Sequence, residues 1–237
     1  MINNTHTKDN IDINDNVDEL KNIFFKNLTC PVCENCFETA TIKAKVPRIA
    51  SKDSDFLIRY NIENPYFYEV CLCPSCGYAA LRTDFKKIKT HQKILVKERI
   101  SSKWVNRDYN LPFTENIAIE RYKLALVNSI MAEANFGTKA IICLRIAWMY
   151  RLLEDEVNEI NYITQALSAF NEAYLNESLP IYGLDKFSLM FLIGELNRRI
   201  GQDATASRWF SEVIVSIGAD QKVKEMSRNG NDKIRGY

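Results

Sequence analysis

The chain has 237 residues, of which 46% are apolar and 26% are charged, a composition typical of a globular protein with room for a substantial core. Its 31 Lys and Arg against 30 Asp and Glu leave a formal net charge of +1, which excludes a polycation built to bind nucleic acid along its whole length. The longest apolar stretch, residues 141–150, is too short to span a bilayer and contains Arg145, so no membrane partner is expected.

Residues 1–22 are rich in Asn and Asp and contain few large apolar side chains. Such a segment cannot bury enough surface to offset the entropy lost on ordering, so we predict a disordered tail over 1–22. It also lacks the basic and apolar blocks of a signal peptide, which favours a cytoplasmic protein.

Residues 23–84 alternate short β-prone runs with turn residues, and they contain six of the seven cysteines. Residues 39–46 alternate in polarity and residues 66–72 form an aromatic run, and both patterns favour strands. We therefore predict a small β module over 23–84.

Two C-P-x-C motifs, Cys30 to Cys33 and Cys73 to Cys76, are separated by 39 residues. The two-residue spacing lets both thiolates of a tight turn bind one ion, and two such turns complete a tetrahedron. Because four thiolates form a soft, closed shell, we predict a structural zinc site, with iron as the chemical competitor. The spacing makes 23–84 a zinc-ribbon-like module.

The remaining cysteines have other interpretations. Cys36 and Cys71 flank the motifs, so each could replace a ligand or the two could form a redox pair, although small buried or surface thiols are the simpler reading. Cys143 lies in an apolar helical stretch and is assigned to the core.

Asp53, Asp55 and the Asn64-Pro65 pair stand between the predicted strands. Carboxylates beside a metal module could bind a cation or act as acid and base. Asp and Asn-Pro are also common turn formers, and without a neighbouring His, Lys or open metal site the turn reading is preferred.

Residues 85–112 are predicted to form a basic linker helix. Val96, Ile100 and Trp104 recur every four residues. Residues 82–107, which overlap this region, carry a local charge of +7. Their charged side chains are Arg82, Lys86, Lys87, Lys89, Lys93, Lys97, Arg99, Lys103 and Arg107 against Asp84 and Glu98. Contact with nucleic acid is one interpretation, and a solvated helix face that balances acidic stretches elsewhere is the preferred one.

Residues 113–237 show long helical patterns with a recurring motif. An alanine, an aromatic residue four positions later and a small residue three positions after that occur three times, at Ala118/Tyr122/Ala125, Ala166/Phe170/Ala173 and Ala206/Phe210/Val213. Small residues let antiparallel helices approach closely, and the aromatic ring fills the groove between neighbouring pairs. The motif predicts helical-hairpin repeats.

This helical part resembles tetratricopeptide repeats, most clearly in residues 192–201 followed by Ala206 and Phe210. The repeat starts are 48 and 40 residues apart, longer than the usual repeat of about 34. Asn197 stands where the repeat prefers Tyr, and no proline closes each repeat. A generic helical bundle is the alternative.

Four ordered motifs also resemble the bacterial domain-of-unknown-function family 2225. They are Cys30-Pro31-Val32-Cys33, Asp53-Ser54-Asp55-Phe56, residues 64–70, and Cys73-Pro74-Ser75-Cys76-Gly77-Tyr78-Ala79-Ala80. Glu34 follows the first knuckle, where the family often has Gly. The resemblance implies a knuckle-bearing first part and a tetratricopeptide-like second part, and it implies no activity.

The sequence lacks a GxGxxG, a phosphate loop, an HExxH and a GxSxG motif. We therefore expect a mainly α protein with a small β part that is not an enzyme, namely a zinc-binding adaptor that holds a protein or peptide partner on its helical array. A nucleic-acid-binding zinc ribbon and a thiol redox protein using Cys36 and Cys71 are the alternatives.

Overall fold

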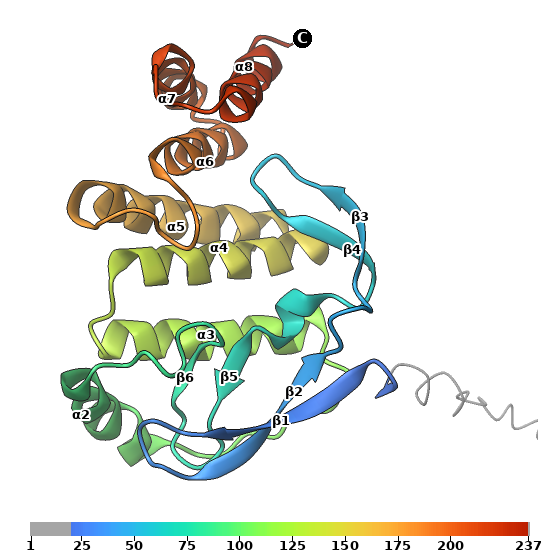
Figure 1. Cartoon of the computed structure of the whole chain (residues 1–237), viewed down its shortest axis with the longest axis vertical. Helices are drawn as coiled ribbons and strands as arrows, with labels where there is room; N and C mark the ends of the chain where they lie inside the picture. The colour runs from blue at the N-terminus through green and yellow to red at the C-terminus, as the bar shows by residue number, and fades with distance from the viewer. Residues whose placement is uncertain (1–19, 237) are drawn as a thin grey trace, which may run out of the picture.

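Strands come first and helices follow in the computed structural model, which describes residues 20–236 (Figure 1). The predicted fold class, a small β part followed by a helical array, is confirmed. Most of the tail predicted over 1–22 falls in residues 1–19, which lie outside the described residues.

The β part consists of three two-stranded antiparallel hairpins. These are β1 (Ile23–Thr29) with β2 (Cys36–Ile42), β3 (Arg48–Lys52) with β4 (Ile58–Ile62), and β5 (Val70–Leu72) with β6 (Ala79–Leu81). The register of the first hairpin ends at Thr29 opposite Cys36, and that of the third ends at Leu72 opposite Ala79. Each C-P-x-C motif therefore forms the tip of a hairpin.

The strand predicted over residues 66–72 forms only in its second half, where β5 begins at Val70. The first half is a 3₁₀ turn, η1 (Pro65–Tyr68). The Asn64 side chain accepts a hydrogen bond from the Tyr66 amide at 3.0 Å, and Pro65 supplies a helical φ angle at the start of the turn. The local capping chemistry thus overrides the β propensity of the aromatic run.

The basic segment contains a short helix, α2 (Thr90–Arg99), followed by the 3₁₀ turn η2 (Ser101–Lys103). Residues 104–113 carry no helix. Val96 is buried against the metal module, and Ile100 is half-buried beside it. Trp104 follows α2 and η2, so its position is set by the non-helical segment after them and not by the helix.

Six helices make up the array, and they are α3 (Glu115–Met131), α4 (Phe136–Leu152), α5 (Glu156–Asn176), α6 (Lys186–Arg199), α7 (Asp203–Val215) and α8 (Gln221–Arg235). Four of them begin after a side chain that caps a free backbone amide, namely Thr114, Asp155, Asp185 and Asp220. The helices stack in chain order from α3 to α8. The β1–β2 and β5–β6 hairpins lie near α3 at one end of the stack, and the β3–β4 hairpin lies along its side (Figure 1). Among the described residues, no helix is long and apolar enough to cross a membrane.

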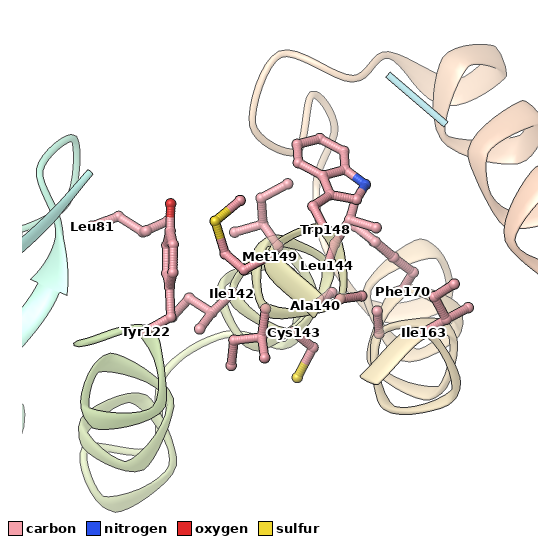
Figure 2. Packing of buried hydrophobic residues seen from close by; sticks show 14 of the residues in the cluster. Leu81, Tyr122, Ala140, Ile142, Cys143, Leu144, Trp148, Met149, Ile163 and Phe170 are labelled. Atoms are coloured by element: carbon pink, nitrogen blue, oxygen red, sulfur yellow. The ribbon is translucent and has the colours of Figure 1, made fainter. Parts of the chain in front are cut away.

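Helix α4 is the centre of the core and has apolar side chains around its whole circumference. In Figure 2, Ile142 and Met149 point toward Tyr122 of α3, whereas Phe170 lies on the opposite side, on α5. The same continuous core includes six side chains of the β part, and they are Leu57, Tyr66, Val70, Leu72, Ala79 and Leu81. The hairpins are therefore built into the core of the array.

The recurring motif of the helical part falls on alternate helices, α3, α5 and α7. All nine of its side chains are buried, with no residue more than 1% exposed. The ring of Phe210 contacts Gly194 of α6 on one edge and Gly230 of α8 on another, where an added Cβ would lie 2.8 Å and 2.6 Å from ring carbons. The aromatic side chain thus fills a groove that glycines leave open.

Candidate metal centre

The first hairpin tip is a turn closed by two backbone hydrogen bonds. The Cys30 amide donates to the Asn35 carbonyl at 2.9 Å, and the Glu34 amide donates to the Cys30 carbonyl at 2.9 Å. Glu34 takes a left-handed φ of +65°, a conformation that favours glycine. This turn carries Cys30 and Cys33 on one side.

The second tip repeats the backbone hydrogen bonding of the first. The Cys73 amide donates to the Tyr78 carbonyl at 2.9 Å, and the Gly77 amide donates to the Cys73 carbonyl at 3.0 Å. Gly77 has a φ of +72° at the position that Glu34 occupies in the first tip. Two sequence-distant motifs have therefore formed the same knuckle.

The knuckles face each other and bring the four predicted ligands together. The Sγ atoms of Cys30 and Cys76 are 3.6 Å apart, and those of Cys33 and Cys73 are also 3.6 Å apart. All four sulfurs lie within 4.8 Å of one another. Since an ion about 2.3 Å from four tetrahedral sulfurs spaces them about 3.8 Å apart, the arrangement fits a tetrathiolate metal ion.

The site is closed to solvent on most sides. Cys30 and Cys73 are fully buried, Cys76 is nearly so, and Cys33 is half-buried. Hydrogen bonds among the thiols lower the pKa of Cys73 and raise that of Cys30. One thiolate therefore forms readily, and a cation would favour deprotonation of the others.

Aromatic residues and α2 support the second knuckle. The Trp104 ring lies against Gly77, where an added Cβ would be 2.4 Å from the indole, and its Nε1 donates to the Pro74 carbonyl at 2.7 Å. The Tyr78 hydroxyl donates to the carbonyl of Phe85 at 3.2 Å. Gly77 is thus required both for its backbone angle and for the close approach of the indole.

The other three cysteines do not join the cluster. Cys36 is exposed, and its sulfur lies 3.5 Å from the Thr29 hydroxyl. Cys71 is fully buried, and burial raises the pKa of its thiol. Cys143 is buried in α4, where burial raises its pKa to about 12, in agreement with its assignment to the core.

Asp55 lies at the tip of the β3–β4 hairpin, and its side chain is fully buried among helices. Arg151 of α4 forms a two-pronged ion pair with it, at 2.7 Å and 2.9 Å, and the Trp148 indole donates to it at 3.0 Å. Arg199 of α6 lies 3.5 Å away. Burial raises the pKa of Asp55, but Arg151 outweighs it, so that the net pKa lies below the ordinary value.

The rest of this hairpin tip is fixed in the same way. Asp53 accepts hydrogen bonds from Arg59 at 2.9 Å and from Arg151 at 3.0 Å. The Ser54 hydroxyl donates to Glu195 of α6 at 2.6 Å. Both carboxylates are turn residues, in agreement with the preferred interpretation, but they also anchor the hairpin to two helices, α4 and α6. Sequence reasoning missed this role, and the only available signal was an arginine in the last turn of an apolar helix.

A second anchor connects Glu69 with α3 and α4. Glu69 Oε2 accepts from Arg145 Nε and from the Tyr122 hydroxyl, both at 2.8 Å. The Arg145 guanidinium lies against the rings of Tyr66 and Trp148, at 4.6 Å and 4.4 Å. This contact places a cationic group on the surface of α4 that faces the hairpins.

Three adjoining cavities form a groove along that surface of α4. Their volumes are about 230, 600 and 300 Å³, and neighbouring cavities share lining residues. The floor is α4, joined in the first cavity by α3. The segment from Leu81 to Lys87 lines the first two cavities, and the α5–α6 loop from Glu177 to Leu184 lines the second and third. We call this feature the α4 groove.

Two contacts hold the walls of the α4 groove in place. The Tyr182 hydroxyl, on the α5–α6 loop, donates to Asp84 on the opposite wall and contacts the Thr138 hydroxyl at 3.1 Å. The Glu177 carboxylate accepts from the Gly137 amide in the first turn of α4, at 3.2 Å. The groove is therefore a built feature with fixed sides.

Helix α2 and its flanking turns expose a cluster of lysines beside the metal centre. Lys87 pairs with Asp84, and Arg99 pairs with Glu133. Within residues 20–236, no ion pair involves the other lysines of this cluster, which are Lys86, Lys89, Lys93, Lys97 and Lys103. The +7 charge of the segment is thus only partly balanced within the described structure.

Comparison with known proteins gives a family and no activity. The model of a bacterial family described as "Uncharacterized protein conserved in bacteria (DUF2225)" matches residues 23–234. An uncharacterized protein of Borreliella burgdorferi is 26% identical over 169 residues, which are 63% of this chain and 61% of that relative. No solved structure matches the chain. Since the family model spans nearly the whole described structure, the chain belongs to the DUF2225 family.

Proposed function

We propose that the protein is a non-enzymatic, cytoplasmic adaptor in which a structural zinc ion fixes the hairpins and the α4 groove binds a peptide segment of a protein partner. The α4 groove is the observation that carries this proposal. It consists of three adjoining cavities along α3 and α4, and its walls combine apolar surface with hydrogen-bonding groups, which suits an extended peptide.

Zinc is the metal that this donor set favours. Cys30, Cys33, Cys73 and Cys76 would hold it, and four thiolates leave no position for a reacting water, so its role would be to join two hairpin tips. Iron in the same tetrathiolate shell is the competitor. Elemental analysis of purified protein distinguishes the two metals.

The helical array supports the peptide-binding part of the proposal. The buried motif on α3, α5 and α7 is the packing chemistry of helical-hairpin repeats, and stacked hairpins of this kind create elongated binding surfaces. A tetratricopeptide-like array is therefore part of the proposal, with the long spacing and Asn197 as its departures from that repeat.

The test is selection of peptides from a displayed random library against the full-length, metal-loaded chain. Thr83 and Ser178 are exposed, stand on opposite walls of the groove and make no side-chain hydrogen bond in the described structure. Replacing each with Trp should fill the groove and reduce binding of selected peptides by about tenfold or more. Ser168→Trp, on an exposed face of α5 outside the groove, is the matched control.

If no peptide is enriched, or if Thr83→Trp and Ser178→Trp bind selected peptides as tightly as the wild type, the peptide-binding proposal is wrong. If Ser168→Trp, which lies outside the groove, weakens peptide binding as much as the groove variants do, the groove is not the binding site and the proposal is also wrong.

A nucleic-acid-binding protein is the second candidate, and the unpaired lysines of α2 favour it. Each phosphate neutralised by a cation releases counterions, so about five lysine contacts predict that log K falls with log salt with a slope near −4 to −5. Fluorescence anisotropy with mixed-sequence oligonucleotides measures this slope. A flat salt dependence, or no binding at low salt, would exclude this candidate.

A thiol redox protein using Cys36 and Cys71 is the third candidate. A reactive thiol needs a low pKa and access to solvent, whereas Cys71 is buried and its pKa is raised. Rapid alkylation of Cys71 in the metal-loaded protein, detected by mass spectrometry, would support this candidate against the physical argument.

A further inference from the structure

Arg121 of α3 is a buried cation with no carboxylate partner. The residue is only 7% exposed, its Nη2 donates to the Val70 carbonyl at 2.7 Å, and its Nε is buried without a hydrogen bond. Within residues 20–236 no carboxylate lies within ion-pair distance of it. Buried charges are normally paired, because desolvation of an unpaired ion is costly.

The other arginines buried near the helices are satisfied differently. Arg145 pairs with Glu69, and Arg151 pairs with Asp53, Asp55 and Glu159. In place of a carboxylate, Arg121 has two aromatic rings beside its charge. The rings of Tyr109 and Phe113 lie 5.4 Å and 4.6 Å from its guanidinium carbon. Ring faces attract a cation but do not supply a full counter-charge.

A cavity of about 190 Å³ adjoins this guanidinium. It is open to solvent and is lined by β1 and β2, the segment around Leu72 and Pro74, residues 106–113 and α3, and it shares no lining residue with the α4 groove. The lining is mixed, with apolar side chains such as Leu72, Leu111 and Phe113 beside polar groups of β2 and residues 106–108. The hydroxyl of Tyr109, which also lines the cavity, is buried and makes no hydrogen bond.

The charges at the rim of the cavity are already engaged or exposed. Arg107 pairs with Glu120, and Asp108 accepts a hydrogen bond from Asn106. Glu38 is exposed on β2. Among the charged side chains that line the cavity, Arg121 is therefore the one that is buried and has no ionic partner.

We propose that this cavity binds a small carboxylate with a short apolar body, held by the guanidinium of Arg121 and by the Tyr109 hydroxyl. A planar guanidinium matches a carboxylate in geometry and gives a strong, charge-assisted contact. The cavity of about 190 Å³ has room for a small anion of this kind. Burial lowers the pKa of Arg121, and a bound anion would offset that effect.

The test is a titration of the full-length, metal-loaded protein with isovalerate and with isovaleramide, its neutral isostere, at constant ionic strength. Backbone amide resonances of residues 106–113 and the side-chain Nε–H resonance of Arg121 are followed by ¹⁵N spectroscopy. We expect saturable shifts with isovalerate and at least about tenfold weaker binding of isovaleramide, because the amide carries no charge.

Two variants locate the site. Arg121→Lys keeps the charge but removes the planar fork, and it should weaken isovalerate binding by about tenfold. Because Arg121 also supports α3, Tyr109→Phe provides a milder variant that keeps the ring, and it should weaken binding by about two- to tenfold. Tyr174→Phe, on α5 far along the array, is the matched control and should bind as the wild type does.

Equal binding of acid and amide, or unchanged affinity in both Arg121→Lys and Tyr109→Phe, would overturn the proposal. Tighter binding of inorganic phosphate than of isovalerate would also overturn it, because the cavity would then select a tetrahedral anion.

Discussion

The contact between Phe210 and two glycines makes the helical packing testable, because the effect of Gly194→Ala on the free energy of unfolding should change sign when the ring is removed. Gly194 on α6 and Gly230 on α8 face the same ring, so a methyl group added at either position meets Phe210. The substitution Gly194→Ala therefore changes two opposing quantities at once, the helix propensity and the packing of the ring.

The magnitude follows from the distances. The Cβ introduced by Gly194→Ala would lie 2.8 Å from a ring carbon, about 1 Å inside the optimum carbon–carbon separation of about 3.5–4.0 Å. The ring cannot retreat, because Gly230 closes its other side and Phe210 is fully buried. Overpacking costs about 1–3 kcal/mol, and Ala recovers about 1 kcal/mol of helix propensity, so Gly194→Ala should reduce the free energy of unfolding by up to about 2 kcal/mol.

The sign reverses when the ring is removed. Phe210→Ala alone should cost about 3–5 kcal/mol, because the ring fills the space between three helices. In that background the methyl group of Gly194→Ala no longer meets the ring, although Trp209 Cβ remains 3.2 Å from it, so the second substitution should stabilise by up to about 1 kcal/mol. The coupling energy of the cycle is then about 1–3 kcal/mol.

Urea unfolding of the full-length, metal-loaded chain, followed by far-ultraviolet circular dichroism, measures all four free energies. Ser168→Ala, at an exposed position of α5, is the control, because it changes propensity alone and should have the same effect with and without Phe210. The packing argument fails if Gly194→Ala has the same effect in both backgrounds.

Three further outcomes are expected. Metal analysis should find one zinc per chain, lost in Cys73→Ser but kept in Cys36→Ser. Chelation should also change the tryptophan fluorescence, because Trp104 lies against the second knuckle. Retention of zinc by Cys73→Ser would contradict the tetrathiolate site. Asp55→Asn should reduce the free energy of unfolding by about 3–5 kcal/mol at neutral pH, because it removes the counter-charge of buried arginines. Since the pKa of Asp55 is lowered in the folded protein, this loss of stability should shrink as the pH falls below the ordinary pKa of 3.8. A loss that is independent of pH between about 7 and about 2 would refute the ion-pair explanation. Glu34→Gly should stabilise the metal-loaded chain by about 1 kcal/mol in urea unfolding, since it relieves a left-handed φ of +65° at the first knuckle. A loss of stability would show instead that the Glu34 side chain stabilises the fold.

The sequence by itself determined the parts of this protein that depend on local chemistry. Two C-P-x-C motifs predict the four ligands Cys30, Cys33, Cys73 and Cys76, because a knuckle needs only a few adjacent residues to form. The recurring alanine and aromatic positions predict which faces of α3, α5 and α7 are buried, because helical periodicity follows from the spacing of apolar residues.

Only the tertiary structure decided how the β part and the helices combine. The ion pair of Asp55 with Arg151 joins residues 96 positions apart, and the contact of Glu69 with Arg145 joins residues 76 positions apart, so no local pattern indicates either. The uncompensated charge of Arg121 likewise becomes visible only once its neighbours are known, because a single arginine in a helical sequence has the same local signature whether it is exposed or buried. Motifs within a few residues fix the knuckles and helix faces, whereas the groove, the anchors and the buried cation arise from distant segments meeting in one core.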